Sequence, residues 1–258
     1  HLVFPVNDLE YRVTTDASLS ALADQCPIVV DQPLTFVLGP NQTIEETPSV
    51  LAHSLLLETS NYWQDWVRTL AIPFDWQEEV IRAAITLKLC TFEDTGAVLA
   101  ALTTSIPEGP GSGRNWDYRY CWLRDSYFVI QALNRLGATR TMEAYLHFID
   151  HIVAGSAVRE LQPVYSLAGS HDIEERVVTS LAGYRGMGPV RVGNQAYLQK
   201  QYDVYGAVIL AAAQMFIDER LPRMGDADLF RRLEPLGVQA RRFALEPDAG
   251  PWEYRGRQ

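Results

Sequence analysis

Polar and aromatic side chains are concentrated over residues 115–125, which hold two Trp, two Tyr, two Arg and two Asp. This mixture suits a sugar, because aromatic rings pack against its C–H faces and charged groups bind its hydroxyls strongly. Asp125 is expected in the first turn of a helix, where a carboxylate is favoured, and Arg124 can donate beside it. We therefore predict that Arg124 and Asp125 bind a sugar. The alternative is that Arg124 and Asp125 form only a helix cap or an ion pair and that the aromatic residues belong to the core.

Residues 183–194 form a second candidate segment. Its glycines and proline specify a shaped loop, from which Arg185, Arg191 and Asn194 project just before a predicted helix. A purely structural loop, in which Asn194 caps that helix, is an equally good interpretation. A phosphate-binding loop is the third, but the glycines do not follow a predicted strand, as such loops do.

The third candidate segment is residues 250–256, which place Trp252 next to Glu253. A carboxylic acid held against an apolar ring keeps its proton more readily, because burial disfavours the charged form. Such an acid can protonate the leaving oxygen of a glycosidic bond. The alternative is an exposed glutamate in a turn.

Several other acids and histidines lie outside these three segments. Glu108, Glu174 and Glu175 fall in long loops, and we interpret them as solvated, with a catalytic role as the alternative. His147 and His151 are four residues apart but lack the Glu of the metalloprotease motif. No metal site and no cofactor are therefore expected.

The elements that must position these side chains are mainly helical. Short β-branched and aromatic runs predict strands over residues 11–15, 28–30 and 34–38. Apolar spacing predicts helices over residues 50–70, 124–136, 139–154, 194–216 and 226–243, and one more opened by a capping box at 75–78. The connections 91–122 and 156–193 are long, and such loops are usually functional. Helical hairpins in series are consistent with a helical barrel.

Composition narrows the classes of partner. Of the 258 residues 47% are hydrophobic, which is typical of a globular protein, and the net charge of −10 argues against nucleic acid. No apolar run approaches the roughly 20 residues of a membrane span. Cys26, Cys90 and Cys121 form no spaced pair, so buried free thiols are expected. No signal peptide is recognisable, which favours a cytoplasmic protein, although the chain begins at His1 without Met and a lost leader is left open.

The motifs together resemble glycoside hydrolase family 15, which comprises glucoamylases, bacterial and archaeal trehalases and glucodextranases. The matching segments follow the family's order and resemble its bacterial branch: Thr103–Glu108, Arg114–Asp125, Gly183–Gly186, Pro189–Asn194, Gln201–Gly206 and Trp252–Gly256. The resemblance covers essentially the whole chain, and the motif over Arg114–Asp125 is the most specific.

The resemblance implies an (α/α)6 barrel preceded by a β-sandwich domain. Residues 1–48 would be the C-terminal remnant of the sandwich, 49–72 a linker helix, and 73–258 the N-terminal half of a truncated catalytic domain. The implied activity is inverting hydrolysis of an α-glucoside, either an α-glucan or maltooligosaccharide or trehalose, without a cofactor. A homo-oligomer is left open. The alternatives are a non-catalytic carbohydrate-binding protein and another sugar enzyme, such as a phosphorylase or epimerase.

Roles are carried over by motif. The resemblance makes Glu253 the general acid with Trp252 beside it, and Arg124 and Asp125 the groups that bind the terminal glucose. It also places several residues around the substrate: Tyr118, Tyr120, Trp122, Arg185 and Arg191. Fungal members have a second acid where this chain has Tyr254. The contact that this acid makes to the second subsite of the sugar is therefore not assigned to this chain. The family's catalytic base lies well beyond the acid, so none is assigned, and we expect the chain to be a piece of a longer polypeptide.

Overall fold

The computed structural model describes residues 1–156 and 160–253, and the chain divides into two compact units, His1–Arg68 and Thr69–Gln258. The boundary lies close to the end of the linker helix predicted at residue 72. Each unit is described separately below.

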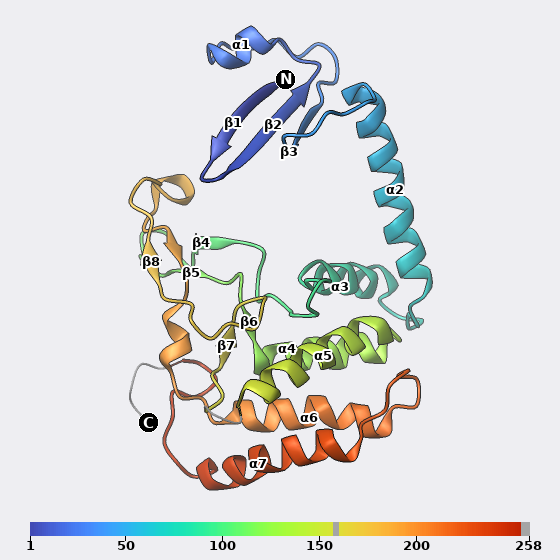
Figure 1. Cartoon of the computed structure of the whole chain (residues 1–258), viewed down its shortest axis with the longest axis vertical. Coiled ribbons are helices and arrows are strands. Elements are labelled where there is room, and N and C mark those ends of the chain that lie inside the picture. The colour runs from blue at the N-terminus through green and yellow to red at the C-terminus, as the bar shows by residue number, and fades with distance from the viewer. Residues whose placement is uncertain (157–159, 254–258) are drawn as a thin grey trace. The chain divides into compact units, whose positions relative to one another are not determined.

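The first unit contains a small antiparallel sheet in the order β1-β2-β3, followed by a long helix (Figure 1). Its elements are β1 Leu2–Val6, β2 Leu9–Thr15, α1 Leu19–Ala23, β3 Phe36–Pro40 and α2 Pro48–Arg68. Two of the predicted strands and the helix are present. The strand predicted at 28–30 is wrong, since Val29 and Val30 are exposed and unpaired with the sheet. That run lies between Pro27 and Pro33, and proline cannot donate to a ladder.

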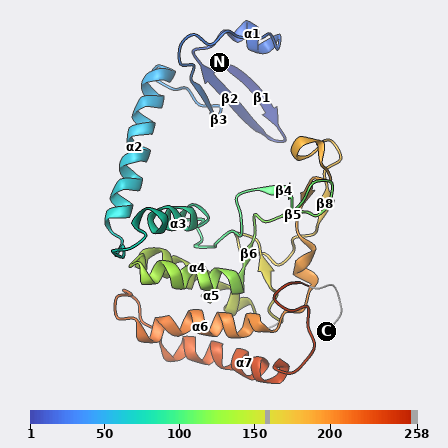
Figure 2. The same cartoon turned by 180° about the vertical axis from the view of Figure 1, so that it is seen from behind.

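The described residues of the second unit contain five α-helices: α3 Gln77–Leu89, α4 Leu123–Arg135, α5 Thr139–Ser156, α6 Asp203–Ile217 and α7 Ala227–Phe243. Helix α4 packs against α5 and α6, and α6 also packs against α7 (Figures 1 and 2). Their shared core contains Leu133, Tyr145 and Val208, all almost inaccessible to solvent. The predicted mainly helical character is therefore confirmed. Within the described ranges, no helix is both long and apolar enough to span a bilayer.

Short strands give the two long connections their shape. Where the connections are described, these strands pair as two-stranded ladders: β4 Thr104–Pro107 with β5 Asn115–Asp117, β6 Cys121–Trp122 with β7 Val164–Tyr165, and β8 Arg176–Val177 with β9 Arg191–Val192. In the second ladder Trp122 lies opposite Val164. This pairing joins the two connections directly at the N-terminus of α4, so each supports the residues that the other carries there.

Two predicted helix boundaries are wrong. The helix expected over 194–216 is interrupted: a short 3₁₀ helix, Gln195–Leu198, ends at Gln199, whose extended ψ of 148° breaks the helix before α6 begins. The capping box at Asp75 does not form, because α3 has Trp76 at its N-cap with φ of 60°. Asp75 is therefore one residue too early to cap the helix with its side chain.

The three cysteines are free, but only one is buried. Cys121 is fully enclosed, Cys90 is partly exposed and Cys26 is exposed. Burial raises the pKa of the Cys121 thiol to about 11. The expectation of buried thiols is thus correct for Cys121 and wrong for Cys26, which lies in the exposed connection between α1 and β3.

Candidate active site

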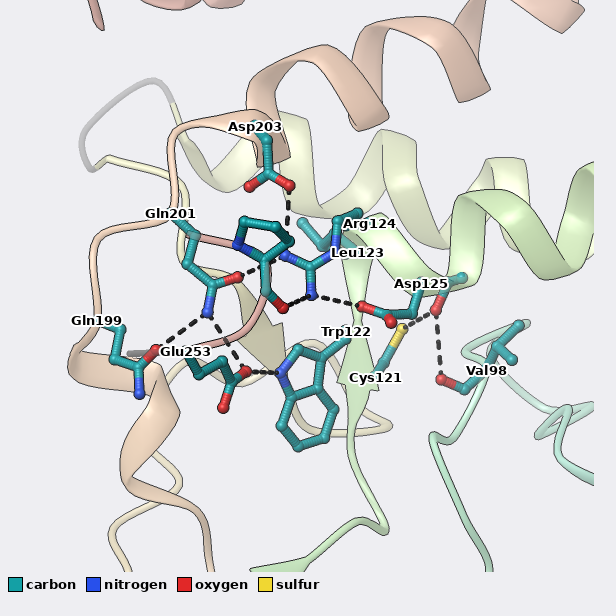
Figure 3. Close-up of polar contacts among 12 residues, drawn as sticks. Val98, Cys121, Trp122, Leu123, Arg124, Asp125, Gln199, Gln201, Asp203 and Glu253 are labelled. Atoms are coloured by element: carbon teal, nitrogen blue, oxygen red, sulfur yellow. Dashed lines mark hydrogen bonds and ion pairs between the residues drawn. The ribbon is translucent and has the colours of Figure 1, made fainter. Parts of the chain in front are cut away.

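The centre of the candidate site is a hydrogen bond between residues that are far apart in the sequence. Trp122 Nε1 donates to Glu253 Oε1 over 2.8 Å, across a sequence separation of 131 residues (Figure 3). Trp122 is buried where β6 passes into α4, and Glu253 lies in the turn at residues 250–253, which comes after α7. The predicted acid therefore has an aromatic neighbour, but it is Trp122, since the Trp252 side chain is 79% exposed.

Gln201 is the second partner of Glu253, and sequence reasoning assigned it no role. Its Nε2 donates to Glu253 Oε1 over 3.3 Å and to Gln199 Oε1 over 3.0 Å, while its Oε1 accepts from Arg124. The side chain is buried, in the break between the 3₁₀ helix and α6. The signal that could have found it is its place in the motif Gln201–Gly206 just ahead of a helix.

Arg124 connects three segments of the second unit. Its Nη1 donates to Gln201 Oε1 over 3.0 Å and Asp203 Oδ2 over 3.3 Å, and its Nη2 donates to Asp125 Oδ2 over 3.1 Å and the Pro251 carbonyl over 3.3 Å. These contacts join the first turn of α4, the first turn of α6 and the segment that carries Glu253 (Figure 3). Arg124 therefore holds these three segments together, and this structural role does not depend on any hydrogen bond that it donates to a ligand.

Asp125 is the most accessible acid of this group. Its side chain is 57% exposed, and Arg124 holds one of its two oxygens, Oδ2. The residue lies in the first turn of α4, where the helix dipole favours a negative charge. A carboxylate that is fixed at one oxygen and open at the other can accept hydrogen bonds from an added hydroxyl compound.

Two tyrosines pack beside the buried Trp122. The rings of Tyr118 and Trp122 are 5.9 Å apart, and Tyr120 packs against the same small apolar cluster around Trp122 and Val164. Burial raises the pKa of both phenols, and the nearby charges of Glu108 and Glu253 raise that of Tyr118 further. Both hydroxyls therefore remain protonated at neutral pH.

Glu108 is an exposed loop residue, as predicted, but neighbouring side chains also hold its carboxylate. Its Oε1 accepts from Trp116 Nε1 over 2.9 Å and from the Tyr118 hydroxyl over 3.4 Å, and its Oε2 is paired with Arg114. The hydrogen bond from Arg114 lowers the pKa of Glu108, so the group is a carboxylate at neutral pH. Its bond to Tyr118 connects the β4–β5 hairpin to the cluster around Trp122.

Arg191 and Arg185, both predicted to contact substrate, have different surroundings. Arg191 is enclosed: it donates to Glu175 Oε1 over 2.9 Å and to the Asn115 carbonyl over 3.0 Å, and it lies over the Trp116 ring. Glu175 is therefore paired and mostly buried, contrary to the solvated interpretation. Arg185 is exposed, over the ring of its neighbour Tyr184, and none of its described contacts reaches the Trp122 cluster.

Half of the predicted sugar motif is structural. Asp117 is fully buried and accepts from both Arg119 Nε and Arg119 Nη2 over 2.8 Å. It also accepts from the Gly193 amide over 3.2 Å, and its carbonyl accepts from Asn194 Nδ2 over 3.0 Å. Asn194 also caps the 3₁₀ helix that follows it. The structural interpretation is therefore right for Asn194, and Asp117, to which sequence reasoning gave no role of its own, joins it in fixing the 191–194 segment to β5.

Comparison with known proteins defines the class to which this helical chain belongs. The model of the family described as "Glycosyl hydrolases family 15" matches residues 76–258, so the chain belongs to that family, whose fold is an α/α-barrel. Tyr254, where fungal members have a second acid, lies outside the described residues.

Its curated relatives include several proteins named trehalase. The chain is 36% identical over 221 residues to the trehalase of Mycobacterium tuberculosis, covering 84% of this chain and 31% of the relative. It is 38% identical over 218 residues to that of Mycolicibacterium smegmatis (83% and 31%) and 35% identical over 201 residues to that of Thermoplasma volcanium (78% and 31%). The chain thus spans about a third of the length of these relatives. No solved structure matches it.

Proposed function

We propose that this protein hydrolyses an α-glucoside with inversion and that trehalose is its substrate. The observation that carries the proposal is the hydrogen bond of Glu253 to the buried Trp122, beside the fixed pair Arg124 and Asp125. Family membership and relatives named trehalase support a glycosidase and support trehalose over longer α-glucans. Residues 73–258 are then part of the catalytic barrel, 49–72 a linker helix and 1–48 the end of a sandwich domain.

In this proposal Glu253 is the general acid. A protonated carboxyl group delivers its proton to the glycosidic oxygen as the C–O bond breaks, while a second carboxylate activates water on the opposite face of the sugar. None of the described residues is assigned as that base. Glu108, with its three hydrogen-bonding partners, is occupied by protein contacts and is not a candidate.

The remaining residues bind the sugar. Asp125 accepts from two neighbouring hydroxyls of the terminal glucose, and Arg124 keeps Asp125 in place and can donate beside it. The ring faces of Tyr118, Tyr120 and Trp122 pack against C–H groups of the sugar. The Tyr120 hydroxyl donates to a sugar oxygen, while the Tyr118 hydroxyl, which donates to Glu108, accepts from a sugar hydroxyl. Arg191, Arg185 and Trp252 are proposed as outer contacts, Arg191 as part of the pocket wall.

Replacing the acid tests the proposal. Glu253→Gln in the full-length protein removes the transferable proton while keeping the acceptor Oε1, so we expect turnover of trehalose to fall by about 10²–10⁴-fold. Binding of a non-hydrolysed glucoside, followed by calorimetry, should change little. The matched control is Glu246→Gln, an exposed glutamate in the same segment, which should leave turnover unchanged.

The assay measures glucose released from trehalose and from maltooligosaccharides, and polarimetry or NMR identifies its anomer. Release of β-glucose from an α-linked substrate supports inversion. Equal activity of Glu253→Gln and the wild type would exclude Glu253 as the acid. Sugar binding without turnover in the wild type would instead support a non-catalytic carbohydrate-binding protein, and turnover that depends on phosphate would indicate a phosphorylase.

A further inference from the structure

We infer that Gln201 is a positioning residue that fixes the acidic proton of Glu253 on one particular oxygen, Oε2. The inference rests on the proposed role of Glu253 as general acid, which does not specify which of the two carboxyl oxygens carries the proton. A carboxylic acid has two oxygens, and only the one that carries the proton can transfer it. Three described side chains, Arg124, Gln201 and Trp122, together determine which oxygen that is (Figure 3).

The first step is the orientation of the Gln201 amide. An arginine guanidinium can only donate hydrogen bonds. Because Arg124 Nη1 lies 3.0 Å from one end of the amide, that end must be the carbonyl oxygen Oε1. The other end is then the NH₂ group, which lies 3.3 Å from Glu253 Oε1 and 3.0 Å from Gln199 Oε1. The rotated amide would set its NH₂ group against the donors of Arg124.

Burial prevents the Gln201 amide from rotating out of this orientation. The Gln201 side chain is 3% exposed, so water cannot replace a partner that is lost when the amide rotates. Arg124 is itself held by Asp203, Asp125 and the Pro251 carbonyl, and so it cannot turn away to accommodate the rotated amide. The donor that Gln201 presents to Glu253 is thus built into the fold.

The second step concerns the two oxygens of Glu253. The indole of Trp122 is also a donor only, and its Nε1 lies 2.8 Å from the same atom, Oε1. Two donors therefore converge on Oε1, while no donor among the described residues reaches Oε2. A proton on Oε1 would compete with the N–H groups of Trp122 and Gln201 for the same lone pairs. The protonated acid must therefore carry its hydrogen on Oε2.

This arrangement assists proton transfer. The O–H bond at Oε2 breaks with its electron pair left on Glu253, the proton bonds to the glycosidic oxygen, and the sugar C–O bond breaks. Hydrogen bonds to a charged acceptor are stronger than those to a neutral one. Trp122 and Gln201 therefore stabilise the carboxylate that forms more than the acid that reacts, without moving from Oε1.

The test uses the full-length protein and two substitutions of Gln201. Gln201→Met keeps the length of the side chain but removes the donor, and Gln201→Glu replaces the donor by an acceptor. Loss of the donor disfavours the charged form of Glu253, so the alkaline limb of the pH–activity profile should move up by about one pH unit in Gln201→Met and further in Gln201→Glu. We expect kcat to fall about tenfold or more with KM changed little.

Two controls separate this role from a structural one. Gln195→Met, at an exposed position in the preceding 3₁₀ helix, should keep the wild-type profile. Trp122→Phe removes the other donor to Oε1 while keeping an aromatic ring, so it should shift the alkaline limb in the same direction as Gln201→Met. This variant also serves where a Gln201 variant fails to fold.

A second measurement makes the inference independent of turnover. The protonation of Glu253 can be followed by infrared spectroscopy of protein labelled with ¹³C-glutamate, with Glu253→Gln identifying its band. The midpoint of that band should rise in Gln201→Met, in Gln201→Glu and in Trp122→Phe. Unchanged midpoints in folded variants would overturn the inference, even in an active enzyme. A wild type without hydrolytic activity would instead refute the proposed function, while the infrared midpoints still decide the role of Gln201.

Discussion

Asp117→Asn tests whether the first half of the 115–125 motif supports the fold. The wild-type carboxylate is fully buried and accepts four hydrogen bonds: three from Arg119 and one from the Gly193 amide. Asparagine has the same shape but only one acceptor oxygen. Whichever way its amide turns, the NH₂ group faces donors, so two of the four hydrogen bonds are lost.

The magnitude follows from which bonds are lost. One amide orientation leaves the Gly193 N–H without a partner at a buried site, which costs about 1–3 kcal/mol, and breaks a charge-assisted bond of about 1.5–3 kcal/mol. The Arg119 side chain is 42% exposed and recovers part of that loss by hydration. The other orientation instead loses the bonds that the Arg119 Nε and backbone amide donate. We therefore expect the free energy of unfolding to fall by about 2–4 kcal/mol.

Equilibrium urea unfolding followed by circular dichroism measures this change. The matched control is Asp172→Asn, at an exposed acid in the same unit, which should lie within about 0.5 kcal/mol of the wild type. A loss below about 1 kcal/mol for Asp117→Asn would refute the reasoning, because it would show that the four donors find other partners. A normal stability combined with weaker sugar binding would instead place Asp117 in the binding site.

Two further predictions concern the same scaffold. Gly193 has φ of +87°, and a Cβ there would overlap the backbone of Glu174, so Gly193→Ala should destabilise the protein by about 2–4 kcal/mol in urea unfolding. The control is Gly111→Ala, which also has positive φ but open space around it and should cost about 1 kcal/mol. Equal losses of stability in the two variants would contradict the steric argument. The hydrogen bond from Arg114 lowers the pKa of Glu108 below its usual 4.5, so its stabilisation is present above that value and lost as the pH falls through the lowered pKa. The urea midpoint should therefore fall more steeply below pH 5 in the wild type than in Glu108→Gln, and parallel curves would contradict this.

The structure divides the 115–125 motif between two tasks. Asp117 and Arg119 face inward and anchor the 191–194 segment, whereas Arg124 and Asp125 join the segment that carries Glu253. Trp122 lies between the two halves, because its strand pairs with β7 and its indole binds Glu253. A single motif can therefore combine scaffold and site residues, and its density of polar side chains does not distinguish them.

The sequence by itself determined the helices, the family and the candidate acid. Helical spacing of apolar residues is a local property, so α4, α5 and α7 begin and end within a few residues of the predictions. The motifs that resemble glycoside hydrolase family 15 lie within short segments, and the match over residues 76–258 confirms that resemblance. Glu253 was selected for the same reason, as part of a short motif.

Only the tertiary structure decided which residues surround that acid. The aromatic partner of Glu253 is Trp122 and not the adjacent Trp252, Gln201 lies between Glu253 and Arg124, and Glu108 is held by three neighbours. The contacts of Glu253 do not follow from local spacing, because they join loops that are far apart in the chain. The partners of Glu108 are near in sequence, but only the folded β4–β5 hairpin brings their side chains to it. A hydrogen bond across 131 residues requires a packed helical core that brings the two segments within reach.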